Sequence, residues 1–336
     1  MHTPDPVLTA SIHTSTGLDG VIHAAIVPFW RELRDRGGAE RWRLWMVRYG
    51  RRGPHLKLRL HGPGEERGEV RASLERAVRA HLPAPPGTPA AGKADADDPD
   101  APPIDTEDEG AGGYPEGALL WTHYRRSPVS LGPAAHLGSD RYAALLTACL
   151  ACAGEMALAE FEAGIPPAGA RQRALLRGVI AGLGATRFRH ASREEYLAYH
   201  RDWLLRFCVA DEPRAAEARA QMDRHVDAMG DAVERIGRVA EEQWRPDASA
   251  EAGDDRDEDG DGSWRGAIDG LCRYLEAFDG ADGAYTDPFA GEPMMGPVFK
   301  VFHGLANQLG VPVLQEALVH HLVLRAAGGA AVSLAA

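Results

Sequence analysis

Cysteine is scarce in this sequence, and its arrangement argues against a metal or redox centre. Of the 4 cysteines, Cys149 and Cys152 have the two-residue spacing of a zinc or redox pair. No second Cys or His pair follows at ligand spacing, and the pair lies within an apolar run with helical character. Because a free cysteine behaves as a small hydrophobic residue, we expect buried structural thiols, with metal or redox use as the alternative.

The sequence also lacks long apolar runs, a targeting segment and an excess of positive charge. No stretch of 18 uncharged apolar residues occurs, and residues 1–6 lack the basic and apolar regions of a signal peptide. The formal net charge is -12, whereas nucleic-acid binders usually carry a basic stripe. We therefore expect a cytoplasmic protein that binds neither membrane nor nucleic acid.

Common catalytic and cation-binding motifs are missing as well. The sequence contains no P-loop, dinucleotide fingerprint, HExxH pair or nucleophile elbow. Asp255, Asp257, Asp259 and Gly260 resemble the first half of a calcium loop, but position 12 of that loop is Gly266 instead of glutamate. We interpret the tract 247–262 as a solvated acidic loop.

What is present predicts an α+β fold. Alternating apolar residues predict strands at 6–13, 42–49, 55–61 and 117–124, with helices after Asp19, up to Gly37–Gly38, and at 65–81. Pro28 interrupts the first helix and is expected to kink it. This β-α-β-β-α-β order favours a ferredoxin-like antiparallel sheet. Residues 83–113 have almost no large apolar group, and we expect a disordered insertion there.

The second half of the sequence is helical in pattern. Helices are expected at 140–163, 167–183, 192–208, 212–243, 264–278, 294–309 and 312–326, and Ser192 with Glu195 forms a capping box. We therefore expect one catalytic domain over 1–336, with a sheet portion at 1–130 packed with a mostly helical portion at 139–330.

Titratable residues line one face of the third predicted strand. His55, Lys57, Arg59 and His61 alternate with three leucines, so the four side chains point the same way. Such a row could bind a carboxylate or phosphate, or line a peptide groove. An ordinary solvent-facing side of an antiparallel strand explains the same pattern.

A second candidate lies on the helix at 294–309. Lys300, His303 and Asn307 fall on one face, opposite an apolar stripe of Phe302, Leu305 and Leu309. A histidine held in one tautomer by a neighbouring amide suits proton transfer near neutral pH. A lone helical histidine is more often an ordinary core or surface residue, and that alternative stays open here.

A third candidate is the segment that follows the fourth predicted strand. It carries polar side chains into a Gly- and Pro-rich loop, where functional groups often lie, although a plain surface connection fits equally. These side chains are Arg125, Arg126, Ser127, Ser130 and His136.

Two stretches resemble the glutamate-elimination domain of lantibiotic dehydratases. Residues 45–62, Trp-Met-Val-Arg-Tyr-Gly-Arg-Arg-Gly-Pro-His-Leu-Lys-Leu-Arg-Leu-His-Gly, are similar to that family's W-x-x-x-R-Y-x-D-P-x-x-H-L-R-L-R-x-x-G motif. Residues 303–309, His-Gly-Leu-Ala-Asn-Gln-Leu, fall where the family has H-M-H-x-N-R-L. His303, Asn307 and Arg59 match conserved positions of these motifs.

The departures point to a particular branch. The family's E-x-x-R-Y-G-G motif is replaced by Val-Ser-Leu-Gly-Pro from Val129, and the second His and the Arg of the C-terminal motif are Leu305 and Gln308. A pocket that expels a glutamyl carboxylate needs those cations, whereas one that binds a neutral dehydrated peptide does not. Stand-alone relatives with such losses resemble the pyridine synthases of thiopeptide biosynthesis.

The resemblance implies a cyclase/lyase-type reaction on a ribosomally made, post-translationally modified peptide. Two dehydroalanines join in a formal aza-[4+2] cycloaddition, water and the leader peptide are lost, and a pyridine closes the macrocycle. No metal or organic cofactor is implied. The partner is a precursor peptide with a leader and a dehydrated, azole-containing core, and association with other biosynthetic enzymes is a further expectation.

Roles for individual residues follow as hypotheses from this resemblance. We expect His303 to transfer the proton that forms the iminol, with Asn307 orienting its ring. A hydrogen bond to the attacked carbonyl region is assigned to Arg59, Gln308 or Tyr285. Leader and substrate binding is assigned to the row on the third strand (His55, Lys57, His61), to Arg125, Arg126, Ser127 and Ser130, and to Lys300.

Two alternatives remain. A split elimination domain would release glutamate from glutamylated serine or threonine, and it would need the arginines that this sequence lacks. A non-catalytic module would bind leader peptide for a partner enzyme.

Overall fold

The computed structural model describes residues 7–14, 17–37, 41–49, 54–82, 116–124, 140–186, 192–209, 211–245, 263–282 and 295–328. The chain divides into a sheet unit, Met1–Ala143 with Gly154–Pro166, and a helical unit, Ala144–Ala153 with Pro167–Ala336. The segments at 83–113 and 247–262, expected to be disordered and an acidic loop, lie outside the described residues.

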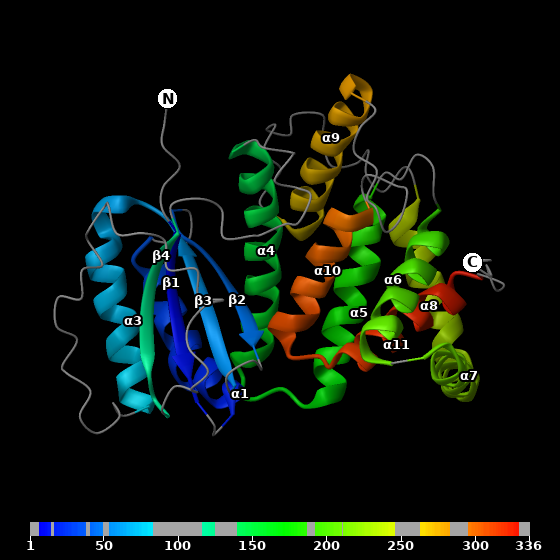
Figure 1. The fold of residues 1–336 in the computed structure, drawn as a ribbon, viewed down its shortest axis with the longest axis horizontal. Helices are drawn as coiled ribbons and strands as arrows, with labels where there is room; N and C mark the ends of the chain where they lie inside the picture. Colours follow the sequence, from blue (N-terminus) through cyan, green and yellow to red (C-terminus); the bar gives the residue numbers. More distant parts are fainter. Residues whose placement is uncertain are drawn as a thin grey trace. The chain divides into compact units, whose positions relative to one another are not determined.

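The sheet unit contains a four-stranded antiparallel sheet. Its strands are β1 (Val7–His13), β2 (Arg43–Tyr49), β3 (His55–His61) and β4 (Leu119–Tyr124), in the spatial order β2-β3-β1-β4 (Figure 1). Between β1 and β2 lie α1 (Leu18–Val21), the π-helical turn η1 (Ile22–Ile26) and α2 (Val27–Asp35). After β3 come the 3-10 turn η2 (Gly64–Glu66) and α3 (Arg67–His81). The expected ferredoxin-like order and the α+β class are confirmed.

The leucines of β3 explain how the sheet holds its helices. Leu56, Leu58 and Leu60 are fully buried, and they pair across β1 with other apolar residues of the same face. Trp121 of β4 lies on this face too, and the guanidinium of Arg71 on α3 stands 5.1 Å from its ring centroid. The period-two pattern therefore gives one apolar face, against which a helix packs.

The irregularity expected around Pro28 is also present. Proline has no backbone N–H, so an α-helical hydrogen bond to the carbonyl four residues earlier cannot form at Pro28. The π-helical turn Ile22–Ile26 lies directly before this position. The helix between β1 and β2 is thus divided where the sequence indicated a kink.

The helical unit follows the expected pattern with one correction. Its helices are α5 (Ala168–Ala185), α6 (Arg193–Cys208), α7 (Glu212–Ala228), α8 (Asp231–Trp244), α9 (Trp264–Asp282), α10 (Met295–Leu309) and α11 (Val313–Ala326), while α4 (Asp140–Phe161) is divided between the two units. The single helix expected at 212–243 is wrong. Gly230 adopts φ 50°, a conformation that side-chain-bearing residues avoid, and it separates α7 from α8.

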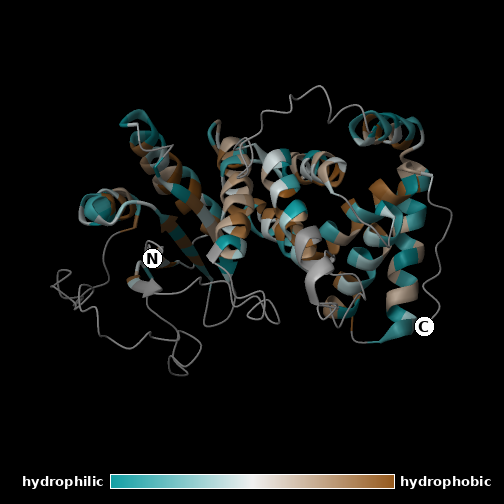
Figure 2. Cartoon of the chain, turned by 90° about the horizontal axis from the view of Figure 1, so that it is seen from above, coloured by the Kyte–Doolittle hydropathy of each residue, from teal (hydrophilic) through white to brown (hydrophobic). Residues whose placement is uncertain are grey.

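The core of the helical unit confirms several local expectations. The stripe of Phe302, Leu305 and Leu309 on α10 is fully buried. Of the expected pair of buried thiols, Cys149 is buried, with its Sγ 3.3 Å from the carbonyl oxygen of Ala267, whereas Cys152 is half-buried. These contacts fit a structural thiol. The helices carry both hydrophobic and hydrophilic residues, as amphipathic packing requires (Figure 2).

One described helix has the length and apolar composition of a membrane span. It is the segment Arg141–Phe161 of α4, and 56% of its apolar window is buried inside the protein. A core helix of a folded domain has the same properties, so this helix is weak evidence for membrane insertion.

Candidate functional site

Helices α6, α10 and α11 of the helical unit bring four polar side chains together in the core. His303 comes from α10, Glu316 from α11, and Tyr196 and His200 from α6. Helix α6 starts at the expected capping box, in which Ser192 Oγ accepts from the backbone N–H of Glu195 at 3.1 Å. The cap therefore fixes the start of the helix that carries two of the four residues.

The four side chains form a continuous hydrogen-bonded chain. The hydroxyl of Tyr196 lies 2.7 Å from His200 Nδ1, and His200 Nε2 lies 3.1 Å from Glu316 Oε1. The other carboxylate oxygen, Glu316 Oε2, lies 2.9 Å from His303 Nδ1. Tyr196, His200 and Glu316 are fully buried, whereas the side chain of His303 is 37% exposed. The series of hydrogen bonds therefore runs from the protein interior to the partly exposed imidazole of His303.

Burial sets the protonation of the interior members. Desolvation lowers the pKa of His200 well below its usual value, and the nearby rings of His320 and His303 lower it further. Desolvation also raises the pKa of Glu316, an effect that the hydrogen bond and charge of His303 oppose. Because His200 stays neutral, it does not compensate the charge of the carboxylate.

His303 behaves differently from the buried histidines. Desolvation lowers its pKa, but the hydrogen bond and the charge of Glu316 act in the opposite direction, and the net shift is upward. An imidazole with a pKa raised from the usual value is protonated over part of the neutral range. His303 can therefore accept and release a proton under physiological conditions.

Three of the buried residues have the chemistry of a metal site. Ligand atoms of His200, Glu316 and His320 all lie within 4.8 Å of one another. The rings of His200 and His320, however, stack with centroids 3.8 Å apart and an interplanar angle of 24°. Lone pairs in the planes of two stacked rings run side by side and do not converge on one ion. The arrangement fits a pair of neutral imidazoles better than a tetrahedral ligand set.

A neighbouring polar group joins three helices. His321 on α11 lies 3.2 Å from Arg201 on α6 and 3.0 Å from a carboxylate oxygen of Asp223 on α7. Arg325 pairs with the same carboxylate and, at 2.8 Å, with Asp227. Desolvation lowers the pKa of His321, and the charge of Arg201 lowers it further. This group pairs its charges internally and fits a structural role.

The polar face of β3 belongs to the sheet unit. His55 and Arg59 are each 7% exposed, so the interpretation as a plain solvent-facing side is wrong for these two residues. Lys57 and His61 are half-buried. His55 stacks between Tyr49 on β2 (5.2 Å) and His13 on β1 (4.6 Å). The row predicted on one strand is thus part of a wider polar face that extends over three strands.

The structure distributes the other predicted residues over both units and beyond. Lys300 and Asn307 are half-buried on α10, on the side of His303. Gln308 is fully buried, and its Nε2 donates to the carbonyl oxygen of Leu150 at 3.1 Å. Tyr285, Arg125, Arg126, Ser127, Ser130 and His136 lie outside the described residues.

Sequence reasoning missed the residue that holds His303. Asn307 was expected to orient its ring, whereas the structure gives Nδ1 the carboxylate of Glu316 as a partner. A signal was available: Glu316 and His320 stand four residues apart on α11, among the apolar residues of Val313–Ala326. Charged residues are almost never fully buried without a partner, so this pair on a core helix marked a polar contact.

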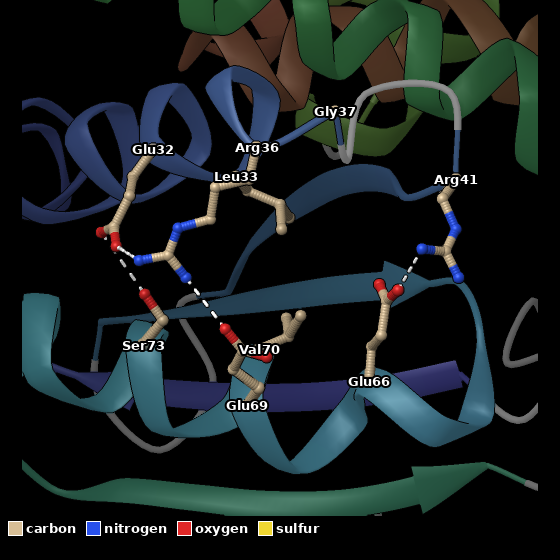
Figure 3. A pocket seen from close by; sticks show the side chains of 9 residues that line it. All are labelled: Glu32, Leu33, Arg36, Gly37, Arg41, Glu66, Glu69, Val70 and Ser73. Carbon is tan, nitrogen blue, oxygen red and sulfur yellow. Dashed lines mark hydrogen bonds and ion pairs between the residues drawn. The ribbon is translucent and has the colours of Figure 1, made fainter.

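A small cavity between α2 and α3 carries charges but no unbalanced cation. It has a volume of about 240 Å³ and is lined on its rim by two arginines and several carboxylates (Figure 3). Arg36 pairs with Glu32 and with Glu69, and Arg41 pairs with Glu66. Exposed ion pairs of this kind contribute little, and both arginines that line the cavity are paired, so we do not take the cavity as an anion site.

A larger groove lies within the helical unit, between α5, α8 and α11. Its volume is about 740 Å³, and its floor is mostly apolar, with Ile180, Ile236 and Leu322 among the lining residues. Arg173, Arg177 and Arg235 line it as well, and no aspartate or glutamate does. An apolar floor with cationic edges has the chemistry to bind an acidic amphipathic peptide.

Comparisons with known proteins bear on the fold of the whole chain. The solved structure of "Pyridine synthase, TbtD, from thiomuracin biosynthesis" matches with a TM-score of 0.55 and 16% sequence identity, over 96% of this chain and 98% of that one. The chain has the fold of this pyridine synthase. The family model "Lantibiotic biosynthesis dehydratase C-term" matches residues 8–126, which span the sheet of the first unit. No curated protein sequence matched in the same comparisons. The resemblance inferred from the β3 motif is thus confirmed for the fold and for the sheet.

Proposed function

We propose that this chain is a pyridine synthase of thiopeptide biosynthesis, acting on a modified precursor peptide. The observation that carries the proposal is His303, a partly exposed imidazole backed by a buried carboxylate, on a chain with the fold of TbtD over nearly its full length. A proton-transferring group of this kind suits the amide–iminol tautomerisation that the cycloaddition requires.

The proposed reaction balances with proton transfers alone. An amide N–H beside one dehydroalanine loses its proton while the carbonyl oxygen gains one, which gives an iminol and completes a 2-azadiene. Two carbon–carbon bonds close the ring onto the second dehydroalanine. The hydroxyl then leaves as water, and the leader leaves as an amide, which makes the ring aromatic. No oxidant or reductant is consumed.

Two residues receive roles in this scheme. His303 takes the amide proton and returns it to the carbonyl oxygen, so one imidazole serves both halves of the tautomerisation. Arg59, 7% exposed on β3, is proposed as the hydrogen-bond donor to the carbonyl region where charge develops. Much of the remaining acceleration comes from holding two distant alkenes in contact, which is an entropic contribution.

The precursor peptide needs a binding surface besides the reacting atoms. The edges of the sheet are β2 and β4, where an extended leader segment could add as a further strand. β3 is a central strand, so His55, Lys57 and His61 are proposed to contact the peptide where it crosses the polar face of the sheet. On α10, Lys300 lies on the same side of the helix as His303 and is proposed to contact the substrate.

A glutamate-elimination activity is less well supported. The arginine expected after β4 and the arginine of the C-terminal motif are absent, because residues 129–133 read Val-Ser-Leu-Gly-Pro and position 308 is glutamine. The buried Gln308 donates to the backbone of Leu150 and offers no charge to a departing carboxylate.

A specific observation favours a second candidate function, a module that only binds leader peptide. The groove between α5, α8 and α11 has an apolar floor, and its lining residues include three arginines and no aspartate or glutamate. An acidic amphipathic leader would fit this lining. The same groove is compatible with a synthase that anchors its substrate, so turnover decides between the two.

One assay separates these functions. The protein is incubated with a dehydrated, azole-bearing precursor, and the products are weighed by mass spectrometry. A synthase yields a core lighter by one water together with a released leader amide. Free glutamate from a glutamylated precursor indicates the elimination activity, and binding without any change in mass indicates the module. Either of the last two results rejects the proposal.

A further inference from the structure

Glu316 is a fully buried carboxylate between two imidazoles of the helical unit. We propose that Glu316 is a positioning residue, which fixes the tautomer of His303 and makes Nε2 of that ring the proton-transferring atom. Tyr196 and His200 hold Glu316 in place from the interior. This inference rests on the proposed function for its kinetic consequences but not for the tautomer itself.

The protonation states of Tyr196, His200 and Glu316 fix the direction of the two interior hydrogen bonds. Tyr196 keeps its phenolic proton, because burial raises its pKa well above the usual value and the charge of Glu316 raises it further. Glu316 Oε1 is a carboxylate oxygen and accepts, so the neutral ring of His200 carries its proton on Nε2. The lone pair of that ring is then on Nδ1, which accepts from the hydroxyl of Tyr196.

The same carboxylate determines the tautomer of His303. Glu316 Oε2 is a carboxylate oxygen and accepts, so the proton between the two residues sits on His303 Nδ1. The neutral ring then has its lone pair on Nε2. Because the side chain is 37% exposed, this second nitrogen is the one that a substrate can reach. A carboxylate behind an imidazole plays the same orienting role in hydrolase triads.

Charge balance gives Glu316 a second role. When Nε2 accepts a proton, His303 becomes a cation whose charge is compensated by the carboxylate 2.9 Å away. Among the described residues, His200 and His320 also interact electrostatically with His303, and burial keeps both neutral, while Lys300 lies one turn earlier on α10. Glu316 is therefore the anion that stabilises the protonated ring, and the ring loses its proton again when the carbonyl oxygen takes it.

His320 supports this arrangement without joining the chain. Its Nδ1 lies 2.9 Å from the backbone oxygen of Glu316, four residues earlier on α11, and this contact fixes the orientation of the ring. The His320 ring also stacks on the His200 ring, with centroids 3.8 Å apart. A second proton on either ring would place a positive charge directly against the other ring. The stacked pair therefore keeps the interior end neutral, which leaves His303 as the site that titrates.

The kinetic test uses Glu316→Gln, which keeps the shape and removes the charge. We expect kcat to fall about 100-fold, in the range of general acid–base effects, with little change in KM. The limb of the pH–rate profile that reports His303 should move to lower pH, because the carboxylate no longer stabilises the cation. Glu241→Gln, an exposed carboxylate on α8, is the matched control and should leave both values unchanged. An unchanged kcat and pH profile in Glu316→Gln would overturn the proposal.

A structural readout works without turnover and without a variant of Glu316. Nitrogen-15 NMR of histidine side chains distinguishes the two neutral tautomers, and the signals of His303 are assigned by their loss in His303→Gln. The wild-type protein should show a proton on Nδ1 and an unprotonated Nε2 at high pH. The opposite tautomer contradicts the inference, whatever the activity of the protein. The expected tautomer in a protein that forms no pyridine would reject the proposed function and leave the inference standing.

A milder variant keeps the inference testable if Glu316→Gln does not fold. Tyr196→Phe removes only the hydroxyl that donates to His200 Nδ1. We expect a smaller loss of kcat than in Glu316→Gln, with the same direction of shift in the pH profile. A Tyr196→Phe protein with a wild-type profile would show that the interior end does not act on His303.

Discussion

The sheet unit and the helical unit both place titratable side chains next to one another, but they do so by different means. In the sheet, one strand supplies His55, Lys57 and Arg59 at every second position, and neighbouring strands extend the row. In the helical unit, His200, His303 and Glu316 come from three helices, and His200 lies 116 residues before Glu316 in the sequence. A local repeat creates the first group, whereas only the packing of helices creates the second.

This difference has consequences for charge. The row on β3 has half-buried members, Lys57 and His61, that keep contact with water. The helical group has a fully buried core, in which desolvation decides the protonation of His200 and His320 and leaves His303 to titrate. Burial thus converts a set of common residue types into one proton-transferring group.

The largest expected effect distinguishes the two groups by rate. His303→Ala should lower kcat for pyridine formation by about 1,000-fold, because it removes the proton-transferring group itself. His55→Ala on β3 should raise KM and leave kcat close to that of the wild type, since it affects peptide binding. Steady-state kinetics with a dehydrated precursor measure both. A kcat loss in His55→Ala equal to that in His303→Ala would remove the distinction between the units.

A second prediction concerns stability against pH. Burial lowers the pKa of His320 to about 4 in the folded protein, from a usual value of 6.5. As pH falls below 6.5 the unfolded chain binds a proton that the folded protein excludes, so this residue destabilises the fold progressively down to about pH 4. Relative to His320→Gln, the wild type should lose about 2.5 kcal/mol of unfolding free energy between pH 7 and pH 4.5.

Urea unfolding at the two pH values measures this difference. Parallel curves for wild type and His320→Gln would mean that the ring takes up protons in the folded state, contrary to the burial argument.

The smallest predicted effect concerns the N-terminal cap of α6, the helix that carries Tyr196 and His200. Ser192→Ala removes the capping oxygen at the start of α6 and should lower the free energy of unfolding by about 1 kcal/mol. Activity should change little, because α6 is also held by the buried contacts of Tyr196 and His200. A loss of kcat without loss of stability would assign the cap a role in the site, which the present account does not.

Local rules made much of the fold predictable from the sequence. The bounds of β3 and the capping box at Ser192 follow from period-two alternation and from a side-chain oxygen three residues ahead of a glutamate. The break between α7 and α8 was not foreseen, because a glycine inside a helical pattern is often tolerated. Only the left-handed conformation of Gly230, visible in the structure, shows that the chain turns there.

The candidate site was predictable only in part. Position on an amphipathic helix and a resemblance to a known motif singled out His303. Its partner Glu316 was missed, because helix periodicity describes neighbours on one helix and not contacts between α10 and α11. Asn307 was the orienting residue that the same-helix spacing suggested. The buried state of Arg59 likewise depends on the polar face of the whole sheet, which one strand does not reveal.

The central claim is that this chain closes a pyridine ring in a modified peptide, with His303 moving the protons. Its most direct test follows a single purified precursor, with its two dehydroalanines in place, before and after addition of the wild-type protein. The account predicts a macrocyclic product with the ultraviolet absorption of an azole-substituted pyridine, formed together with one equivalent of leader amide. A precursor that remains linear with both alkenes intact would contradict the account.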